Sequence, residues 1–444
     1  MTVNPSSKLP CELHLEVFRY VRDSLDNDPS PLAWLAILGV CKQWRQVALG
    51  ASELWTFLRT VHPNLLKLFL KLSQSRPLDF RYVPKTVEDR TRLMKALSNI
   101  LSPHFRRLQK FCVEVPLDTR FNSIELELQW QHSLHCLTHL EICNKEKRCR
   151  ESISALFSSS VLTALETLIL QLSSVKQIKM LRAPRLRSLT VAGNVSMHGP
   201  QALTVDEWLE ILMFTPRLEV LDLQDAVLAP VNIPGQCDKV LLKRLHTIRL
   251  SSFDDIAMSA NLELLTPPDF SEVTDLLISN FDLSCVDSFE LISFHPQYPL
   301  SPEPNTFRFA RLFEQMPGLA HLTVSSSRFM PEYVKEILED DRELPDDIDG
   351  FASNATYYPR FPLLESLSIC AWKDVFAGDL RLVLEALAER AHYGCHICEL
   401  HVCCDKGDAV DRWIDVHQGQ LNEVVGETRT CRSPRQERVE FVRL

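Results

Sequence analysis

The chain has 444 residues, of which 45% are hydrophobic and 24% charged, a composition typical of a globular protein rather than a disordered or fibrous one. Only 12 residues are glycine, against a usual share of roughly 7%, which disfavours glycine-rich phosphate loops and nucleotide-binding folds. The net charge of −10 disfavours nucleic acid and anionic membranes as partners, so we expect the partners to be proteins.

The beginning of the chain has no targeting pattern. Residues 1–10 lack a basic segment followed by a long apolar one, and the uncharged runs near them are too short to span a bilayer. The 14 cysteines are scattered among apolar positions, which favours reduced thiols over the disulfide framework of a secreted protein. We therefore expect a cytoplasmic protein, a nuclear one, or both, with no membrane partner.

The first helix is predicted directly after Leu9. Pro10 suits the first turn of a helix, and Leu13, Val17, Tyr20 and Val21 then form an apolar stripe. A polar break separates this helix from the next apolar segment. About fifty residues bury their apolar surface poorly, so we expect large side chains here to pack on a following domain or to form a partner surface.

The second apolar segment follows Pro31. It contains Val40, Cys41 and Trp44 and ends at Leu54 and Trp55. Together with the first helix, the order of these residues resembles an F-box, the three-helix module that docks substrate receptors onto the Skp-type adaptor of SCF cullin-RING ubiquitin ligases. The resemblance covers roughly residues 8–58, and the remaining chain is similar by pattern to the irregular leucine-rich regions of many fungal F-box proteins.

The resemblance implies which residues form or support the adaptor-binding surface. They are, in chain order, Leu9, Pro10, Leu13, Phe18, Val40, Cys41, Trp44, Leu54 and Trp55. A second interpretation stays open, because repeat arrays need a cap at each end and an amphipathic helical segment can supply one. The two roles are compatible.

A repeated pattern begins at Leu78, with one apolar residue, a second three positions later and a third two positions after that. Most first members are roughly 30 residues apart, near the period of leucine-rich repeats. Leu78/Phe80/Tyr82 is a weaker first member with a shorter spacing. The matches are Leu108/Phe111/Val113, Leu137/Leu140/Ile142, Leu165/Leu168/Leu170, Leu186/Leu189/Val191, Leu218/Leu221/Leu223, Leu245/Ile248/Leu250, Val273/Leu276/Ile278, Leu319/Leu322/Val324, Leu364/Leu367/Ile369 and Ile397/Leu400/Val402. We call these residues the first, second and third anchors of each repeat.

Helical patterns lie between several of the predicted strands. Residues 379–394 carry apolar residues at helical spacing and end at Gly394, and residues 204–214 begin with a capping box. Pro184 and Pro216 each stop a helix shortly before the next strand. The repeating unit is therefore a helix that ends near a proline and is followed by a strand. Such a unit predicts parallel strands covered by helices.

These patterns predict an α/β protein with a small helical F-box-like module over residues 1–62. Residues 63–425 are expected to form an irregular leucine-rich-repeat-like solenoid with a curved parallel sheet, with insertions near 282–306 and 330–359. Residues 426–444 are polar and are expected to form a tail. Positions between the first and second anchors, such as Thr138, Glu219 and His321, are expected to set the specificity for a target.

Two groups of cysteine and histidine residues suggest zinc. The first contains Cys395, Cys398, Cys403 and Cys404, with His392, His396 and His401 nearby. The second contains His132, His135, Cys136, His139 and Cys143. In the first group a repeat strand sends alternate residues to opposite faces, and no second well-spaced pair is present after it. The second group also flanks a strand, where a solvated face explains it. We therefore expect no metal and no cofactor.

The sequence contains no nucleophile elbow, Walker loop, metalloprotease motif or kinase signature. We expect no catalysis. The resemblance implies a substrate-recognition subunit of an SCF-type ubiquitin ligase, with a Skp-type adaptor, a cullin-RING ligase and an unknown target protein as partners. The alternatives are a leucine-rich-repeat-like interaction scaffold without ligase function and a hydrolase with a reactive cysteine.

Overall fold

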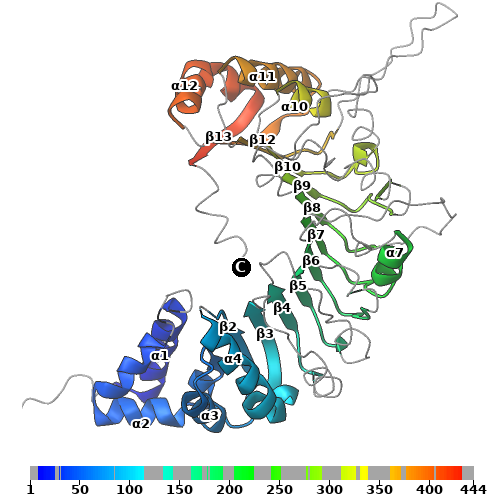
Figure 1. Cartoon of the computed structure of the whole chain (residues 1–444). Coiled ribbons are helices and arrows are strands. Elements are labelled where there is room, and N and C mark those ends of the chain that lie inside the picture. Colours follow the sequence, from blue (N-terminus) through cyan, green and yellow to red (C-terminus); the bar gives the residue numbers. More distant parts are fainter. Residues whose placement is uncertain are drawn as a thin grey trace, which may run out of the picture. The chain divides into compact units, whose positions relative to one another are not determined.

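The chain is an α/β protein with a large parallel sheet, described here from a computed structural model (Figure 1). It divides into two compact units, Met1–Leu186 and Arg187–Leu444. The structure describes residues 9–25, 30, 32–84, 86–114, 134–143, 162–172, 178, 181–193, 205–224, 242–251, 277–278, 281–292, 312–326, 331–338, 361–371, 377–404 and 407–432. Within these ranges no helix is both long and apolar enough to cross a membrane.

Thirteen strands of the described residues follow one another in the sheet in chain order, from β1 to β13. The strands of the first unit are β1 Phe57–Leu58, β2 Leu78–Tyr82, β3 Leu108–Glu114, β4 His139–Cys143 and β5 Thr167–Leu172. Those of the second are β6 Ser188–Gly193, β7 Val220–Gln224, β8 Thr247–Ser251, β9 Ser288–Ile292, β10 His321–Ser326, β11 Ser366–Ala371, β12 Ile397–Cys404 and β13 Val425–Arg432. The α/β class and the parallel sheet predicted from the repeats are confirmed.

The repeat strands from β3 to β12 bury their second and third anchors and turn the residue between them to the other face. In β4, Leu140 and Ile142 are buried while Glu141 is half-buried. The same alternation occurs in β7, where Leu221 and Leu223 are buried. Because successive side chains of a strand point to opposite faces, this pattern gives the sheet one apolar face and one polar face.

One main-chain carbonyl per repeat fixes the position of the next strand. The carbonyl of Thr138, directly after the first anchor of its repeat, accepts hydrogen bonds from the N–H groups of Glu166 (2.8 Å) and Thr167 (2.9 Å). The carbonyl of Arg187 does the same for Glu219 (2.7 Å) and Val220 (2.9 Å). Equivalent residues therefore pair from strand to strand, which keeps all second anchors on the apolar face.

The repeat predicted at Val273/Leu276/Ile278 is wrong. Ile278 is helical, and the strand in this part of the chain is β9, which begins at Ser288. Its buried anchors are Val286, Phe289 and Leu291. They have the same spacing as the predicted set, so apolar spacing alone does not discriminate between the two. A strand of the sheet thus runs through residues 288–292, where an insertion was expected over 282–306.

The C-terminal end of the described chain also differs from the prediction. Residues 425–432 form β13, which pairs in parallel with β12, although a polar tail was expected from residue 426. Gly426 is required by this pairing, because a Cβ there would lie 2.8 Å from the carbonyl oxygen of Cys398. An end strand has one unpaired edge, so its polar composition does not exclude it from the sheet. Residues 433–444 lie outside the described residues.

The described helices that accompany the strands are α3 Pro63–Leu72, α4 Val87–Ala96, η4 Leu97–Leu101, η5 Ser102–Arg107, α7 Val205–Met213, α10 Pro331–Leu338, α11 Ala377–His392 and α12 Gly407–Val424. The predictions for α7 and α11 are confirmed. Gly394 follows α11 with a φ of 77°, the left-handed conformation that commonly ends a helix. Helix α10 occupies the start of the insertion expected over 330–359, and residues 339–360 lie outside the described residues.

The N-terminal helices share a core with the first strands. They are α1 Cys11–Ser24, η2 Ala33–Gly39, α2 Lys42–Gly50 and η3 Ser52–Trp55. The rings of Trp34 and Trp55 lie 5.3 Å apart, and both pack on Phe69 of α3, at 6.1 and 5.0 Å. Strand β1, which follows η3, also pairs with β2, so the N-terminal helices and the start of the sheet pack together.

Candidate protein-interaction surface

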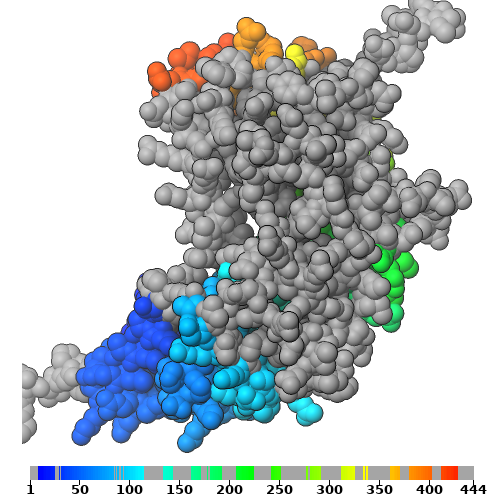
Figure 2. Space-filling view, viewed as in Figure 1, coloured from blue at the N-terminus to red at the C-terminus, as the bar shows by residue number. Residues whose placement is uncertain are grey.

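Helix α1 turns its apolar stripe toward solvent. Leu13 is 50% exposed, Val17 45% and Tyr20 76%, and Leu9, directly before the helix, is 44% exposed. These four residues are spaced by four, four and three positions, so they follow one side of the helix. We call Leu9, Leu13, Val17 and Tyr20 the outer stripe. Helix α1 belongs to the blue N-terminal region of Figure 2.

The opposite side of α1 is buried and contains polar side chains. Its buried residues are His14, Phe18 and Arg22, each four positions after the last. Phe18 packs edge-on against Trp44 of α2, with ring centroids 5.1 Å apart, and His14 lies 5.9 Å from the same ring. The Sγ atom of Cys41 accepts a hydrogen bond from the main-chain N–H of Trp44 (3.4 Å) and caps the start of α2. The buried side of α1 therefore holds α2 in place.

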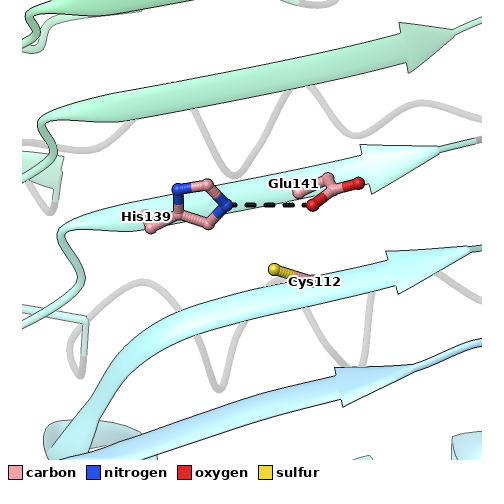
Figure 3. A group of neighbouring side chains, drawn as sticks. All are labelled: Cys112, His139 and Glu141. Carbon is pink, nitrogen blue, oxygen red and sulfur yellow. Dashed lines mark ion pairs between the residues drawn. The ribbon is translucent and has the colours of Figure 1, made fainter. Parts of the chain in front are cut away.

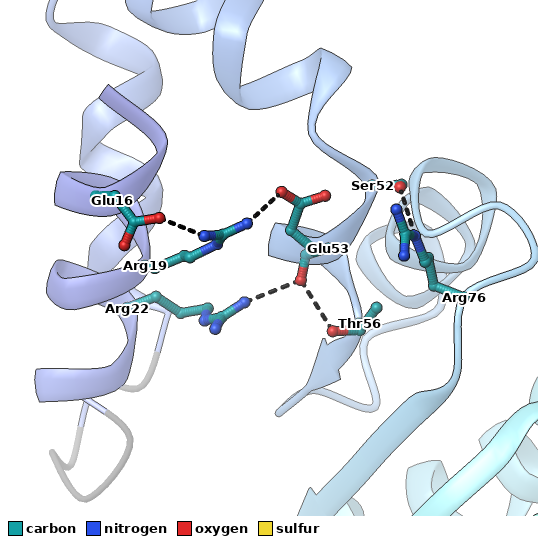
Figure 4. Close-up of polar contacts among 7 residues, drawn as sticks. All are labelled: Glu16, Arg19, Arg22, Ser52, Glu53, Thr56 and Arg76. Carbon is teal, nitrogen blue, oxygen red and sulfur yellow. Dashed lines mark hydrogen bonds and ion pairs between the residues drawn. The ribbon is translucent and has the colours of Figure 1, made fainter. Parts of the chain in front are cut away.

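Arginine side chains fix α1 against η3 (Figure 4). Arg22 donates a hydrogen bond to the carbonyl of Glu53 (2.9 Å), and its guanidinium lies 3.9 Å from the centre of the Phe57 ring. Arg19 pairs with the Glu53 carboxylate (2.8 Å) and with Glu16. These contacts set the orientation of α1, and with it the direction in which the outer stripe points.

The same contacts lower the pKa of Glu53 below its ordinary value. A hydrogen bond from its own main-chain N–H contributes most, and the hydrogen bond and charge of Arg19 add to it, against the opposing effect of burial. The carboxylate therefore stays ionised to lower pH than in an unfolded chain. This part of the module is held by charge as well as by apolar packing.

The nine residues that carry the F-box resemblance divide into three groups by burial. Phe18, Leu54 and Trp55 are fully buried, and Trp55 Nε1 donates to the carbonyl of Ala48 (2.8 Å). Cys41 and Trp44 are half-buried, whereas Leu9, Pro10, Leu13 and Val40 are exposed, Val40 at 60%. The buried group supports the module, and the exposed group is open to a partner.

Exposed apolar side chains concentrate in this module. The described residues contain thirteen large hydrophobic side chains that are exposed, and six of them lie between residues 9 and 50. These six are the outer stripe together with Val40 and Leu49. Scattered exposed apolar residues are ordinary on a protein surface, but a concentration of them on one small module makes it a candidate interaction surface.

The polar face of the sheet is a second candidate surface. It carries residues that lie between the second and third anchors, including Asp222, Arg249 and Glu290 of three neighbouring strands. Arg249 pairs with Glu290 across the strands (2.8 Å). Burial raises the pKa of Asp222, against the hydrogen bond from Gln224 and the charge of Arg249. This face is therefore polar, charged and partly desolvated.

The positions expected to set target specificity have a structural role as well. Thr138 supplies the carbonyl that positions the next strand, and its hydroxyl donates to the carbonyl of Gln109 (3.2 Å). Glu219 pairs with Arg187 (2.9 Å). Sequence reasoning passed over the residues between the second and third anchors, although the alternation of a strand places them on the polar face.

The nine cysteines described with side chains are free thiols. Cys395 is half-buried and Cys398 exposed, whereas the side chains of Cys403 and Cys404 and the whole of His132 lie outside the described residues. His135 and Cys136 are exposed. His139 and Cys143 lie on the polar face of β4 and are half-buried, where a solvated face was expected.

No protein-family model matches the chain, and no curated protein matches it. Among solved structures, a crystal structure of a Bacteroides fragilis protein is similar at 12% sequence identity and a TM-score of 0.34. The similarity covers 80% of this chain and 74% of the other. At this distance it carries no information about function.

Proposed function

We propose that this chain is the substrate-recognition subunit of an SCF-type cullin-RING ubiquitin ligase. In this proposal the outer stripe and Val40 dock a Skp-type adaptor, and the polar sheet face binds a target protein. The strand units form a leucine-rich-repeat-like solenoid with a curved sheet, and the N-terminal helices are its F-box-like module. The chain itself catalyses no reaction.

One observation carries the proposal: the N-terminal module exposes apolar residues that the F-box resemblance implies for adaptor contact. Leu9, Leu13 and Val40 are exposed, while Phe18 and Trp55 of the same motif form the core beneath them. Complete burial of an aliphatic side chain is worth roughly 1.5–3 kcal/mol. The exposed parts of the outer stripe can therefore contribute several kcal/mol to a complex, in the way that central apolar residues dominate protein interfaces.

The module also supports the alternative role of a cap, and the two roles use different residues. Trp55 packs on Phe69 of α3, and Phe57 of β1 pairs with Asp79 of β2, so the module covers the start of the sheet. The outer stripe is not needed for that role. A cap alone would be expected to carry polar residues on its outer side, which is why the exposed stripe favours an adaptor.

Such a receptor acts by proximity. Binding the adaptor and the target at once raises the effective concentration of the target near the ligase. The polar sheet face suits a target with complementary charge, since Arg249, Glu290 and Asp222 give it both signs of charge. An interaction scaffold without ligase function would use the same sheet face, so adaptor binding is the property that separates the two functions.

The test is co-purification of the intact chain with a Skp-type adaptor. A variant carrying Leu9→Asp and Leu13→Asp places two charges on the outer stripe, and we expect it to bind at least tenfold more weakly. Val416→Asp, on α12 and 77% exposed, is the matched control and should bind like the unchanged chain. A folded intact chain that binds no adaptor contradicts the proposal, and the scaffold function then explains the structure better.

A further inference from the structure

Three side chains on the polar face of the first unit lie close enough to share a ligand. They are Cys112 of β3 and His139 and Glu141 of β4 (Figure 3). The Cys112 Sγ atom, a ring nitrogen of His139 and a carboxylate oxygen of Glu141 all lie within 4.8 Å of one another. His139 Nε2 is 3.8 Å from Glu141 Oε2.

The strand register brings these residues together. Cys112 pairs directly with Glu141, and Lys110 pairs with His139. His139 and Glu141 are two positions apart in one strand, so both point to the same face as Cys112. On the other face, Phe111 and Leu140 are buried. The cluster therefore stands on a packed sheet, a rigid support that favours a defined ligand geometry.

The cluster is partly shielded from water. Cys112 is buried, and the side chains of His139 and Glu141 are 24% and 19% exposed. Burial, followed by the charges of Glu141 and Asp79, raises the pKa of the Cys112 thiol, so it is protonated at neutral pH. Burial also acts to raise the pKa of Glu141, but hydrogen bonds from His139 and Cys112 outweigh it and lower that pKa. The site thus holds an ionised carboxylate beside a protonated thiol.

We propose that Cys112, His139 and Glu141 bind one Zn²⁺ ion. On binding, the Cys112 thiol releases its proton to solvent and its sulfur becomes a thiolate ligand, while His139 binds through a neutral ring nitrogen. Thiolate, imidazole and carboxylate are all established ligands of zinc, and the thiolate disfavours Mg²⁺ and Ca²⁺. Three protein ligands leave a fourth position for water or another molecule.

With Zn²⁺ bound, the charge of the ion and the charges of its ligands cancel. Two negative ligands neutralise the two charges of the ion, so the occupied site is neutral. This matters because Arg81 of β2 pairs in register with Cys112 and would repel a site with excess positive charge. Asp79 of the same strand is held by Arg59 (3.0 Å).

Zinc binding needs only small movements of the ligand side chains. Tetrahedral zinc with ligand bonds of about 2.0–2.3 Å requires ligand atoms roughly 3.3–3.8 Å apart. Side-chain rotations of His139 and Glu141 that draw the ligands together by about 1 Å satisfy this, since the final torsions of both side chains are broad. Cys143, on the same face, lies 3.6 Å from Glu141 Oε1 and can orient the carboxylate from outside the ligand set.

The experiment uses the full-length protein, stripped with a chelator and titrated with Zn²⁺ and separately with Co²⁺. We expect one equivalent of either ion to bind, and Co²⁺ to give the near-ultraviolet absorption of a cobalt–thiolate bond. Cys112→Ser should remove this absorption and weaken Zn²⁺ binding at least tenfold. Cys370→Ser, on the polar face of β11, is the matched control and should leave both unchanged.

A second variant guards against misfolding. His139→Asn changes a half-buried residue outside the apolar core and should also weaken Zn²⁺ binding at least tenfold, with an unchanged circular dichroism spectrum. The proposal is overturned if the intact protein takes up no stoichiometric Zn²⁺, or if Cys112→Ser and His139→Asn both fold and retain full affinity. It does not depend on adaptor binding, so either proposal can fail alone.

Discussion

The strands and helix α1 place their apolar residues in opposite ways. In β4 and the other repeat strands, anchors such as Leu140 are buried and residues such as Glu141 face outward. In α1 the apolar Leu13 and Tyr20 face outward, while Arg22 is buried. The strands are stabilised by their own neighbours. Helix α1 keeps apolar area exposed, and a binding partner explains that arrangement best.

The buried side of α1 carries two polar side chains, Arg22 and His14, which differ in their hydrogen-bond partners. Arg22 has the Glu53 carbonyl, Asp23 and the face of Phe57 as partners. Neither ring nitrogen of His14 has a hydrogen-bond partner within the described residues. A buried polar atom without a partner lowers stability, so α1 gives up some stability to present its outer stripe.

The largest effect should follow from breaking the module's core. We expect Trp55→Ala to lower the free energy of unfolding by about 3–5 kcal/mol, because it removes a fully buried ring and its hydrogen bond to Ala48. Urea denaturation followed by circular dichroism measures this. Leu13→Ala should stay within about 0.5 kcal/mol of the unchanged chain, and equal losses in the two variants would contradict the division into buried and exposed groups.

A smaller loss in the free energy of unfolding is expected when the buried Arg22 is replaced. Arg22→Ala removes a charged hydrogen bond to Glu53 and the contact with Phe57, so we expect a loss of about 1–3 kcal/mol. Arg19→Ala breaks a partly solvent-exposed ion pair and should cost at most about 1 kcal/mol. Denaturation of both variants in the same buffer compares them. A greater loss in Arg19→Ala would show that surface charge, rather than the buried face, holds α1.

The sequence predicted the fold class and most strands because a parallel array repeats one burial pattern many times. It missed β13 because an end strand needs little apolar content, and it misplaced β9 because two segments share the same spacing. It predicted the apolar stripe of α1, and the resemblance assigned Leu13 to a partner surface, but the spacing alone did not show which face would be exposed. Helical spacing identifies a stripe, whereas the face that becomes buried depends on what packs there.

The zinc cluster could not be predicted from spacing along the chain. His139 was noted, but Cys112 lies in the preceding repeat, and only the register of β3 and β4 brings it opposite Glu141. Motif searches look for ligands close together in sequence. A search for equivalent positions in successive repeats would have found this pair.

The two units should also differ in their response to pH. Asp222 of the second unit has a raised pKa, so its contribution to stability is full below its ordinary pKa of 3.8 and is lost as pH rises through the raised value. We expect Asp222→Asn to be more stable than the unchanged chain at pH 7 and equal to it at low pH. Thermal unfolding across this pH range measures the difference. Lower stability of Asp222→Asn at pH 7 would mean that ionised Asp222 stabilises the sheet.

Glu53 of the first unit should act with the opposite sign. Its pKa is lowered, so its contribution is present above its ordinary pKa of 4.5 and is lost as pH falls through the lower value. Glu53→Gln should therefore be slightly less stable than the unchanged chain at pH 7, with the gap closing in acid. The same thermal unfolding series detects this small effect, and a gap that widens in acid would contradict it.

The most direct test of adaptor binding by α1 is site-specific crosslinking. A photoreactive amino acid replaces Leu13 of the outer stripe. As a control it replaces Val416 of α12, which is more exposed to solvent than Leu13. The intact protein is then mixed with a Skp-type adaptor and irradiated. We predict a covalent adduct with the adaptor from position 13 and none from position 416. No adduct from position 13, or adducts of equal yield from both positions, would contradict the account.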